Sequence, residues 1–199
     1  MAFVNLKPGT LLAPVPAVLV SCARKGEKPN AVTIAWAGTI NSDPPMVSIS
    51  VRPERYSHDI IEETGEFVVN LCGEDNLQAT DWCGVKSGKD FDKFQECGLT
   101  AVPAEGMEYA PAILECPIYL ACKVKKVERL GSHDMYLGEI VSMGVSDKLM
   151  DETGRIDYGK AKLVAYNHGA YYGLGEALGF FGYSVAAPDV LERRMAQLK

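Results

Sequence analysis

The sequence predicts a mainly β protein, in which short strands form a β-barrel and a few short helices lie at its periphery. Two observations lead to this fold class. Runs of apolar and β-branched residues recur at short, regular spacing with turn residues between them, and the segments with helical character are short and inserted between these runs. The 199 residues, 47% of them hydrophobic, suit one domain over 1–199 with a C-terminal extension from about 147 to 199.

Six segments have strand character. The fifth alternates most cleanly, since Ile118, Leu120 and Cys122 point one way and the residues between them point the other. A short turn containing Gly131 joins it to the sixth as a hairpin. The predicted strands are Pro16–Cys22, Ala31–Trp36, Met46–Val51, Glu66–Leu71, Pro117–Glu128 and His133–Ser146.

Four helices are expected, each with terminal residues that suit it. Ser57 is placed as the N-cap of the first helix and Gly65 as its C-terminal stop. Pro188 lies in the first turn of the last helix. The segment 147–159 reads as a loop. The predicted helices are His58–Thr64, Asp75–Cys83, Asp90–Cys97 and Pro188–Gln197.

The charge and the length of the apolar runs argue against two classes of partner. The net charge is −6 and no basic run occurs, so we expect no nucleic-acid partner. No apolar run approaches the roughly 20 residues that cross a membrane, so we expect no membrane partner.

The six cysteines and the N-terminus both favour a cytoplasmic protein. Cys22, Cys72 and Cys122 lie in or beside apolar runs, where a thiol acts as a small hydrophobic group, and no Cys-x-x-Cys pair is present. The segment 11–22 ends in Leu-Val-Ser-Cys and loosely resembles a lipoprotein cleavage site. Pro14 and Pro16 interrupt it, which favours a strand entering the core.

The segment 28–71 carries most of the information on function. Its first two predicted strands flank an Asn-Ser-Asp-Pro-Pro turn and bring small hydroxylic residues close to Trp36 and Arg52. An indole face, together with hydroxyl, backbone N–H and guanidinium donors, suits a flat aromatic ligand with an anionic tail. Neither a Gly-x-Gly-x-x-Gly nor a Walker-type loop is present, which argues against a dinucleotide fold of the common type.

An anion site can instead form from Arg52, Arg55 and the N-terminus of the helix at Ser57. The alternative, which spacing alone favours, is that Ser57 only caps the helix and the arginines are solvated. Lys93 either reaches a phosphate or a ligand carbonyl, or lies on a solvated helix face.

Other candidates also have two interpretations. Trp36 is either a ligand wall or a core or interface anchor, and Asn30 and Thr33 either donate to a ring carbonyl or complete a turn and a sheet face. His133 opens a strand, where its side chain can point at a ligand, whereas His58 is expected to be exposed. We predict no metal site and no catalytic side chain, since no histidine triad or hydrolase motif is recognisable.

The ordered combination of motifs is specific although each motif is weak. In chain order they read NAVTIAW, SDPPMVSISV, RYSHDIIEETGEFVVNL, CG with SGKDFDKF, the run Ala110–Cys116 and GSHDMYLGEIV. Together they resemble the flavin reductase-like family with the FMN-binding split-barrel fold, in particular its flavoredoxin branch. The segment GAYYGLGEALGFFGYSV also resembles the flavoredoxin tail, so the resemblance covers nearly the whole chain.

The resemblance implies a six-stranded antiparallel split barrel, a homodimer, and one non-covalently bound FMN per subunit near the interface. By position, it assigns one group of residues to the isoalloxazine and ribityl side, a second to the phosphate, and a third to closing the site, partly from the other subunit. These groups are Asn30, Ala31, Thr33 and Trp36; Ser50, Arg52, Tyr56 and Ser57; and Ser87, Lys93 and His133.

One departure from the family bears on the electron donor. NAD(P)H-using flavin reductases often carry a His-x-x-Gly-Arg-like motif here, but GSHDMYLGEI keeps the histidine and lacks the arginine. This favours an electron carrier that exchanges electrons with a redox protein partner. The alternatives are an NAD(P)H-dependent flavin reductase and a non-redox barrel that only binds a planar ligand.

Overall fold

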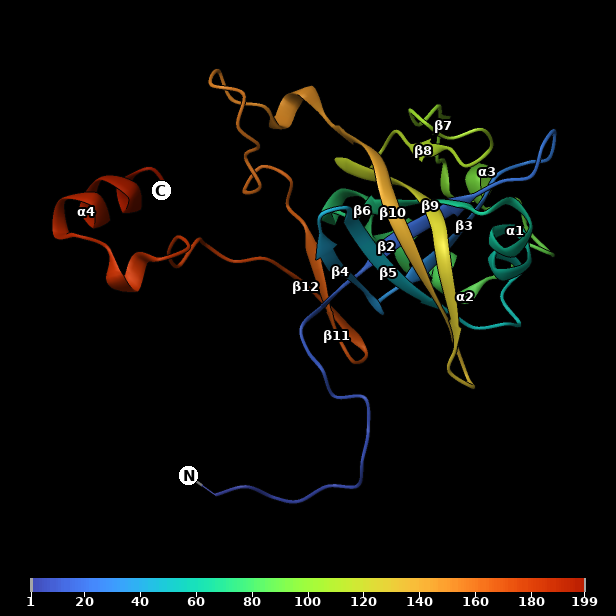
Figure 1. Ribbon diagram of the computed structural model, residues 1–199, viewed down its shortest axis with the longest axis horizontal. Helices are drawn as coiled ribbons and strands as arrows, with labels where there is room; N and C mark the ends of the chain where they lie inside the picture. The colour runs from blue at the N-terminus through green and yellow to red at the C-terminus, as the bar shows by residue number, and fades with distance from the viewer. Residues whose placement is uncertain (1, 199) are drawn as a thin grey trace.

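A curled seven-stranded antiparallel sheet forms the centre of the computed structural model, which describes residues 2–198 (Figure 1). Its strand order is β3-β2-β6-β9-β10-β5-β4, and the two outer strands leave the barrel split. The mainly β split barrel predicted from the sequence is therefore confirmed. The strands are β2 (Val18–Cys22), β3 (Asn30–Ile34), β4 (Ala37–Ser42), β5 (Pro45–Val51), β6 (Glu66–Leu71), β9 (Ile118–Arg129) and β10 (Asp134–Val145).

Within this sheet, the seventh strand, β4, is the one that the sequence did not predict. It pairs with β5 across the turn at Asp43 and Pro44, where the sequence predicted only a turn. Five of its six residues are exposed, so it lies at the edge of the sheet and lacks the alternating apolar pattern of a half-buried strand. The count of six strands was therefore one short for the central sheet.

Residues from both ends of the chain form a small second sheet. Strand β11 (Val164–Asn167) pairs with β1 (Val15–Pro16) and with β12 (Ala170–Gly173). The turn between β11 and β12 has positive φ at His168 and Gly169, at 39° and 114°, which is typical of the two-residue turns that suit hairpins. The expected C-terminal extension thus returns to the barrel and carries a hairpin. A further pair joins β7 (Ala101–Val102) to β8 (Ala112–Ile113).

The four predicted helices are present with shifted ends. They are α1 (Tyr56–Thr64), α2 (Leu77–Val85), α3 (Lys93–Cys97) and α4 (Pro188–Ala196). Three single turns of 3₁₀ helix accompany them, at η1 (Glu74–Asn76), η2 (Asp147–Leu149) and η3 (Tyr183–Val185). Gly65 ends α1 in the left-handed conformation, with φ of 67°, and its N–H donates to the carbonyl of Ile61, as predicted.

The predicted N-cap of α1 was wrong. The helix begins two residues earlier than expected from a Ser57 cap, with Arg55 at the N-cap position and no side chain capping it. Ser57 lies inside the first turn and is buried, and its Oγ accepts a hydrogen bond from Asn30. A serine before an apolar run signals a cap only when its side chain is free to turn back onto the helix.

The core lies on both sides of the sheet. Strand β2 is buried along its whole length, so Val20 packs inside the barrel with Ile49 and Phe67, while Leu19 faces the helices α2 and α3. This burial on both faces explains why β2 reads as a continuous apolar run without alternation. Among residues 2–198, no helix is both long enough and apolar enough to span a bilayer.

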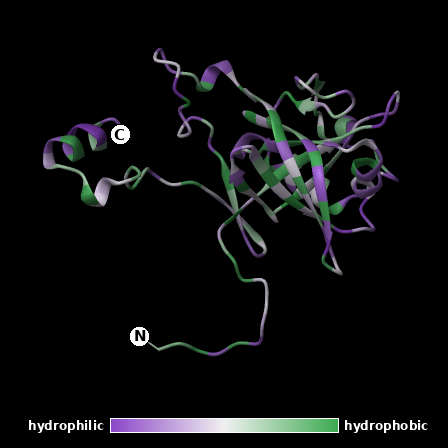
Figure 2. Ribbon diagram, in the orientation of Figure 1, coloured by the Kyte–Doolittle hydropathy of each residue, from purple (hydrophilic) through white to green (hydrophobic). Residues whose placement is uncertain are grey.

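Both ends of the described chain extend away from the barrel (Figure 1). Apolar and polar residues alternate irregularly along them (Figure 2). Leu178 and Val185 in the C-terminal part have exposed fractions of 89% and 87%.

The packing inside the barrel gives a first prediction. A Cβ at Gly138 would lie 2.5 Å from Cζ of Phe67, so Gly138→Ala forces a shift of a buried ring. We expect the free energy of unfolding to fall by about 1–3 kcal/mol in urea titrations. Gly38→Ala is the matched control, because a Cβ there meets nothing within 4 Å. Equal stability of both variants would contradict this packing.

Candidate functional site

The predicted ligand segment folds into a groove made of two adjoining cavities. The first, here called the anion cavity, measures about 390 Å³ and is lined by Asn30, Val32, Arg52, Glu54, Arg55, Tyr56, Ser57, Lys86, Ser87, Gly88 and Lys93. The second, here called the aromatic cavity, measures about 290 Å³ and is lined by Val32, Thr33, Ile34, Ala35, Trp36, Ser50, Val51, Arg52, Arg55, His133, Tyr166 and His168. Because Val32, Arg52 and Arg55 line both, the two cavities are parts of one groove.

Positive charge predominates in the anion cavity. Arg52, Arg55 and Lys86 line it, and the carboxylate of Glu54 pairs with Arg52 at 3.3 Å. The N-terminus of α1 opens here without a side-chain cap. The N–H of His58 donates to the carbonyl of Arg55, so the N–H groups of Tyr56 and Ser57 and the positive end of the helix dipole remain to receive an anion. The residues predicted for an anion site are therefore brought together in one cavity.

Two close contacts fix the shape of the anion cavity. Nδ2 of Asn30 donates to Oγ of Ser57 at 2.7 Å, and both residues are buried, which ties β3 to the first turn of α1. On the other wall, a Cβ at Gly88 would lie only 2.1 Å from Oδ1 of Asn30 and 2.9 Å from Cδ1 of Tyr56. Only glycine allows the loop after α2 to come this close.

Lys93 lies in the wall of the anion cavity and is bound mainly to backbone carbonyls. It is 3% exposed, so it does not lie on a solvated helix face. Its Nζ donates to the carbonyls of Ala31 at 2.8 Å and Cys83 at 2.7 Å, which uses two of its three N–H groups. Burial lowers its pKa. Its charge therefore lies in the wall of the anion cavity, bound to backbone, with at most one donor left for a ligand.

Two aromatic rings that lie far apart in the sequence meet at the aromatic cavity. The ring of His133, just before β10, lies 4.5 Å from the ring of Trp36, between β3 and β4, measured between centroids. Trp36 is 42% exposed, so it is not a core anchor. Burial, and then the charge of Arg52, lower the pKa of His133, which favours its neutral imidazole.

Ten of the eleven residues predicted for the cofactor line this groove. Ala31 lines neither cavity, since it is fully buried and contributes its carbonyl to Lys93. The hydroxyl of Thr33 lines the aromatic cavity but donates to the carbonyl of Thr80. The groove thus brings together residues that lie more than 100 positions apart.

Sequence reasoning left several groove residues out of the predicted cofactor site. Lys86 and Gly88 flank the predicted Ser87, and Arg55 had been considered only as part of an anion site. Tyr166 and His168 come from the β11–β12 hairpin, far along the chain. No local pattern links that hairpin to Trp36, so only the pairing of β11 with β1 could have placed it here.

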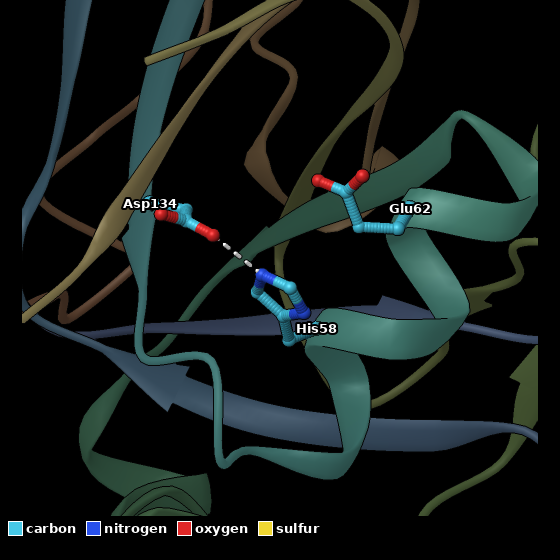
Figure 3. Close-up of side chains that lie close together, drawn as sticks. All are labelled: His58, Glu62 and Asp134. Atoms are coloured by element: carbon cyan, nitrogen blue, oxygen red, sulfur yellow. Dashed lines mark hydrogen bonds and ion pairs between the residues drawn. The ribbon is translucent and has the colours of Figure 1, made fainter. Parts of the chain in front are cut away.

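A second polar cluster lies beside the groove and involves His58, Glu62 and Asp134 (Figure 3). Nε2 of His58 contacts Oδ2 of Asp134 at 2.7 Å, and the ligand atoms of all three lie within 4.8 Å of one another. The side chain of His58 is only 12% exposed, so the expectation that it is exposed was wrong.

A guanidinium already fills the cationic position in this cluster. Arg129 pairs with Glu62 at 3.0 Å and also with Asp134, and the hydroxyl of Tyr136 donates to Glu62 at 2.8 Å. The hydrogen bond from His58, followed by the one from Arg129, lowers the pKa of Asp134. We interpret the cluster as a clamp that holds α1 against β10 next to His133.

Comparison with known proteins decides the family. Residues 11–175 match the flavin reductase like domain. The chain belongs to this family. The resemblance identified from the sequence motifs is thereby confirmed, and the family makes a flavin the cofactor to test against the groove.

Solved structures of flavoredoxins are similar to the chain over most of its length. Flavoredoxin of Desulfovibrio vulgaris is 30% identical with a TM-score of 0.84, and the match covers 90% of this chain and 97% of that one. Flavoredoxin of Methanosarcina acetivorans is 25% identical with a TM-score of 0.84, covering 94% and 100%. An uncharacterized protein of Archaeoglobus fulgidus is 32% identical over 66% of this chain and 74% of its own length.

The groove fits a flavin with a phosphorylated tail. A flavin presents a planar tricycle and an anionic end, and the groove offers an exposed indole at one end and a cationic cradle at the other. The close approach of Gly88 leaves a concave wall that a Cβ would fill.

This close approach gives a second prediction. Gly88→Ala places a Cβ against Asn30 and Tyr56, so the loop must move away and the anion cavity opens. We expect flavin affinity, measured by fluorescence quenching during titration, to fall at least about tenfold, which corresponds to losing one hydrogen bond to a charged group. Gly175→Ala is the control, since a Cβ there meets nothing within 4 Å. Unchanged affinity in Gly88→Ala would show that the anion cavity does not hold the flavin.

Proposed function

We propose that this protein binds FMN and acts in electron transfer, as a carrier similar to the flavoredoxins. The observation that supports this most strongly is the continuity of the anion cavity with the aromatic cavity through Arg52 and Arg55. A phosphate and a planar ring joined by a short chain match such a groove.

Different residues would bind different parts of FMN. Arg52, Arg55 and the first N–H groups of α1 would hold the phosphate, because charge-assisted bonds to guanidinium and helix N-terminal donors suit a phosphomonoester. Trp36 and His133 would border the ring. When bound, the flavin supplies the redox chemistry, while the protein orients it and shields it from water.

FMN suits the groove better than FAD. The cationic part of the groove is a single cavity of about 390 Å³, whereas FAD carries a pyrophosphate and an adenosine that need further room and further donors. Because burial and the charge of Arg52 lower the pKa of His133, its neutral ring is favoured, and this ring would contribute packing and a hydrogen-bonding nitrogen.

A protein partner suits this chain better than NAD(P)H. The segment after His133 lacks the arginine that nucleotide-using reductases often carry, and the next arginine along the chain is Arg155. The net charge of −6 favours a redox protein with a basic surface, because complementary charge speeds encounter. The six cysteines are free thiols, which suits a reducing compartment, and we propose the cytoplasm.

Anaerobic mixing of the flavin-loaded protein with NADH or NADPH gives the third prediction. We expect the visible absorbance of oxidised flavin to persist for minutes with either nucleotide, and to bleach at once with dithionite as the control. Rapid bleaching by a nucleotide would establish an NAD(P)H-dependent flavin reductase instead. A protein that takes up no flavin at all would favour the non-redox ligand-binding barrel.

The extended C-terminal part of the chain supports a homodimer. After Leu174, whose N–H donates to the carbonyl of Leu163, backbone hydrogen bonds in the described tail stay within the tail. Large apolar side chains such as Leu178 and Val185 remain in water in a single chain, at a cost of about 1.5–3 kcal/mol each relative to burial. A second copy of this chain that covers the tail removes this cost.

The fourth prediction concerns this dimer. Light scattering coupled to size-exclusion chromatography should give twice the mass of one chain for the full-length protein. A variant that ends at Gly173 should give a larger share of monomer, while its circular dichroism keeps the strand signature of the barrel. A full-length protein that elutes as a monomer at micromolar concentration would contradict the proposal.

A further inference from the structure

Two cysteine side chains from different helices meet behind the groove. Sγ of Cys83 in α2 and Sγ of Cys97, the last residue of α3, lie 3.9 Å apart. Cys83 is fully buried, whereas Cys97 is half-buried. They belong to the apolar layer between the sheet and these two helices. The binding of a flavin in the groove uses neither thiol.

A separate cavity gives small molecules access to Cys97. It measures about 280 Å³ and is lined by Asp75, Asn76, Gln78, Ala79, Trp82, Glu96, Cys97, Leu99 and Glu115. We call it the Trp82 cavity. It shares no residue with the anion cavity or the aromatic cavity, so a molecule can reach Cys97 while the groove is occupied.

We propose that Cys83 and Cys97 are a redox-active pair, which a peroxide entering through the Trp82 cavity oxidises to a disulfide. The sulfur atoms must close from 3.9 Å to about 2.05 Å, which side-chain rotation and a small shift of α3 can supply. Because α3 has only five residues and ends at Gly98 in the left-handed conformation, its last residue is held by few helical bonds.

The chemistry balances with one peroxide per pair. The thiolate of Cys97 attacks one oxygen of hydrogen peroxide, the O–O bond breaks, and hydroxide leaves and takes up a proton to give water. The sulfur of Cys83 then loses its proton and attacks the sulfenic sulfur of Cys97, and a second hydroxide leaves and becomes water. The two thiols thus lose two electrons, which reduce one peroxide to two waters.

The surroundings of the pair predict a slow reaction at neutral pH. Burial raises the pKa of Cys83 to about 12, and burial also raises that of Cys97. The charged and titratable groups nearby are Lys93 and Glu96 on α3, Cys72 after β6, and the carboxylates of Asp75 and Glu115 in the Trp82 cavity. Because the thiolate is the nucleophile, the rate should rise about tenfold per pH unit between pH 7 and 9.

The pair is connected to the wall of the anion cavity. The carbonyl of Cys83 accepts a hydrogen bond from Nζ of Lys93, and the loop that supplies Lys86, Ser87 and Gly88 runs between α2 and α3. A disulfide would therefore fix both ends of this loop. An effect on flavin affinity rests on the proposed function, but formation of the disulfide does not.

Mass spectrometry of the peroxide-treated protein tests the pair directly. We expect two of the six thiols to become resistant to alkylation, and a tryptic digest to contain Cys83 and Cys97 joined in one cross-linked species. Lysines 86, 89 and 93 separate the two cysteines, so digestion places them in different peptides. The cross-link should vanish in Cys97→Ser and persist in Cys122→Ala, which removes a buried thiol elsewhere in the core.

Three outcomes would overturn the proposal. These are a cross-link between other cysteines, oxidation of Cys97 to sulfinic acid without a cross-link, and retention of all six free thiols at pH 9. Each can be read from the wild-type protein by mass, with or without flavin. A failure of flavin binding therefore does not imitate a failure of the pair.

Discussion

The groove depends on one buried hydrogen bond, from Nδ2 of Asn30 to Oγ of Ser57. It joins the first residue of β3 to the first turn of α1, and both residues are removed from water. A buried amide that loses its partner costs about 1–3 kcal/mol, so this contact fixes the two elements against each other. Gly88 packs directly onto the same amide, and the third wall of the anion cavity is thereby set as well.

Two further sets of polar interactions hold the other walls of the groove in place. Lys93 holds the carbonyls of Ala31 and Cys83, which draws β3, α2 and α3 together around a buried positive charge. On the other side, the clamp of His58, Asp134 and Arg129 holds α1 to the start of β10, next to His133. The site is thus an open groove. Buried or half-buried polar contacts connect the elements around it, namely β3 to α1, β3 to α2 and α3, and α1 to β10.

Sequence patterns predicted the parts of this structure that rest on local chemistry. The alternation of β9, the left-handed stop at Gly65 and the cationic segment around Arg52 each leave a signature within a few residues. Contacts between distant segments left no such signature in the local sequence. Ser57 is a residue type that often caps helices. It becomes a buried hydrogen-bond acceptor only because Asn30 of β3 packs against it and donates to its Oγ.

The same reasoning explains the other misses. Strand β4 is exposed along nearly its whole length and has no apolar face to reveal it, and the β11–β12 hairpin is recognisable only from its pairing with β1. Lys93 follows an acidic segment that suggests solvent exposure, but α3 turns its ammonium toward carbonyls of β3 and α2. In each case the structure was determined by contacts with distant parts of the chain and not by local secondary-structure propensity.

The most direct test of the account is the flavin content of the protein as purified, measured by heating it and separating the released chromophore. The account predicts about one FMN per chain, with no FAD, and reconstitution of any apoprotein by added FMN. A colourless protein that takes up no FMN, or one that releases FAD, would contradict the assignment of the groove.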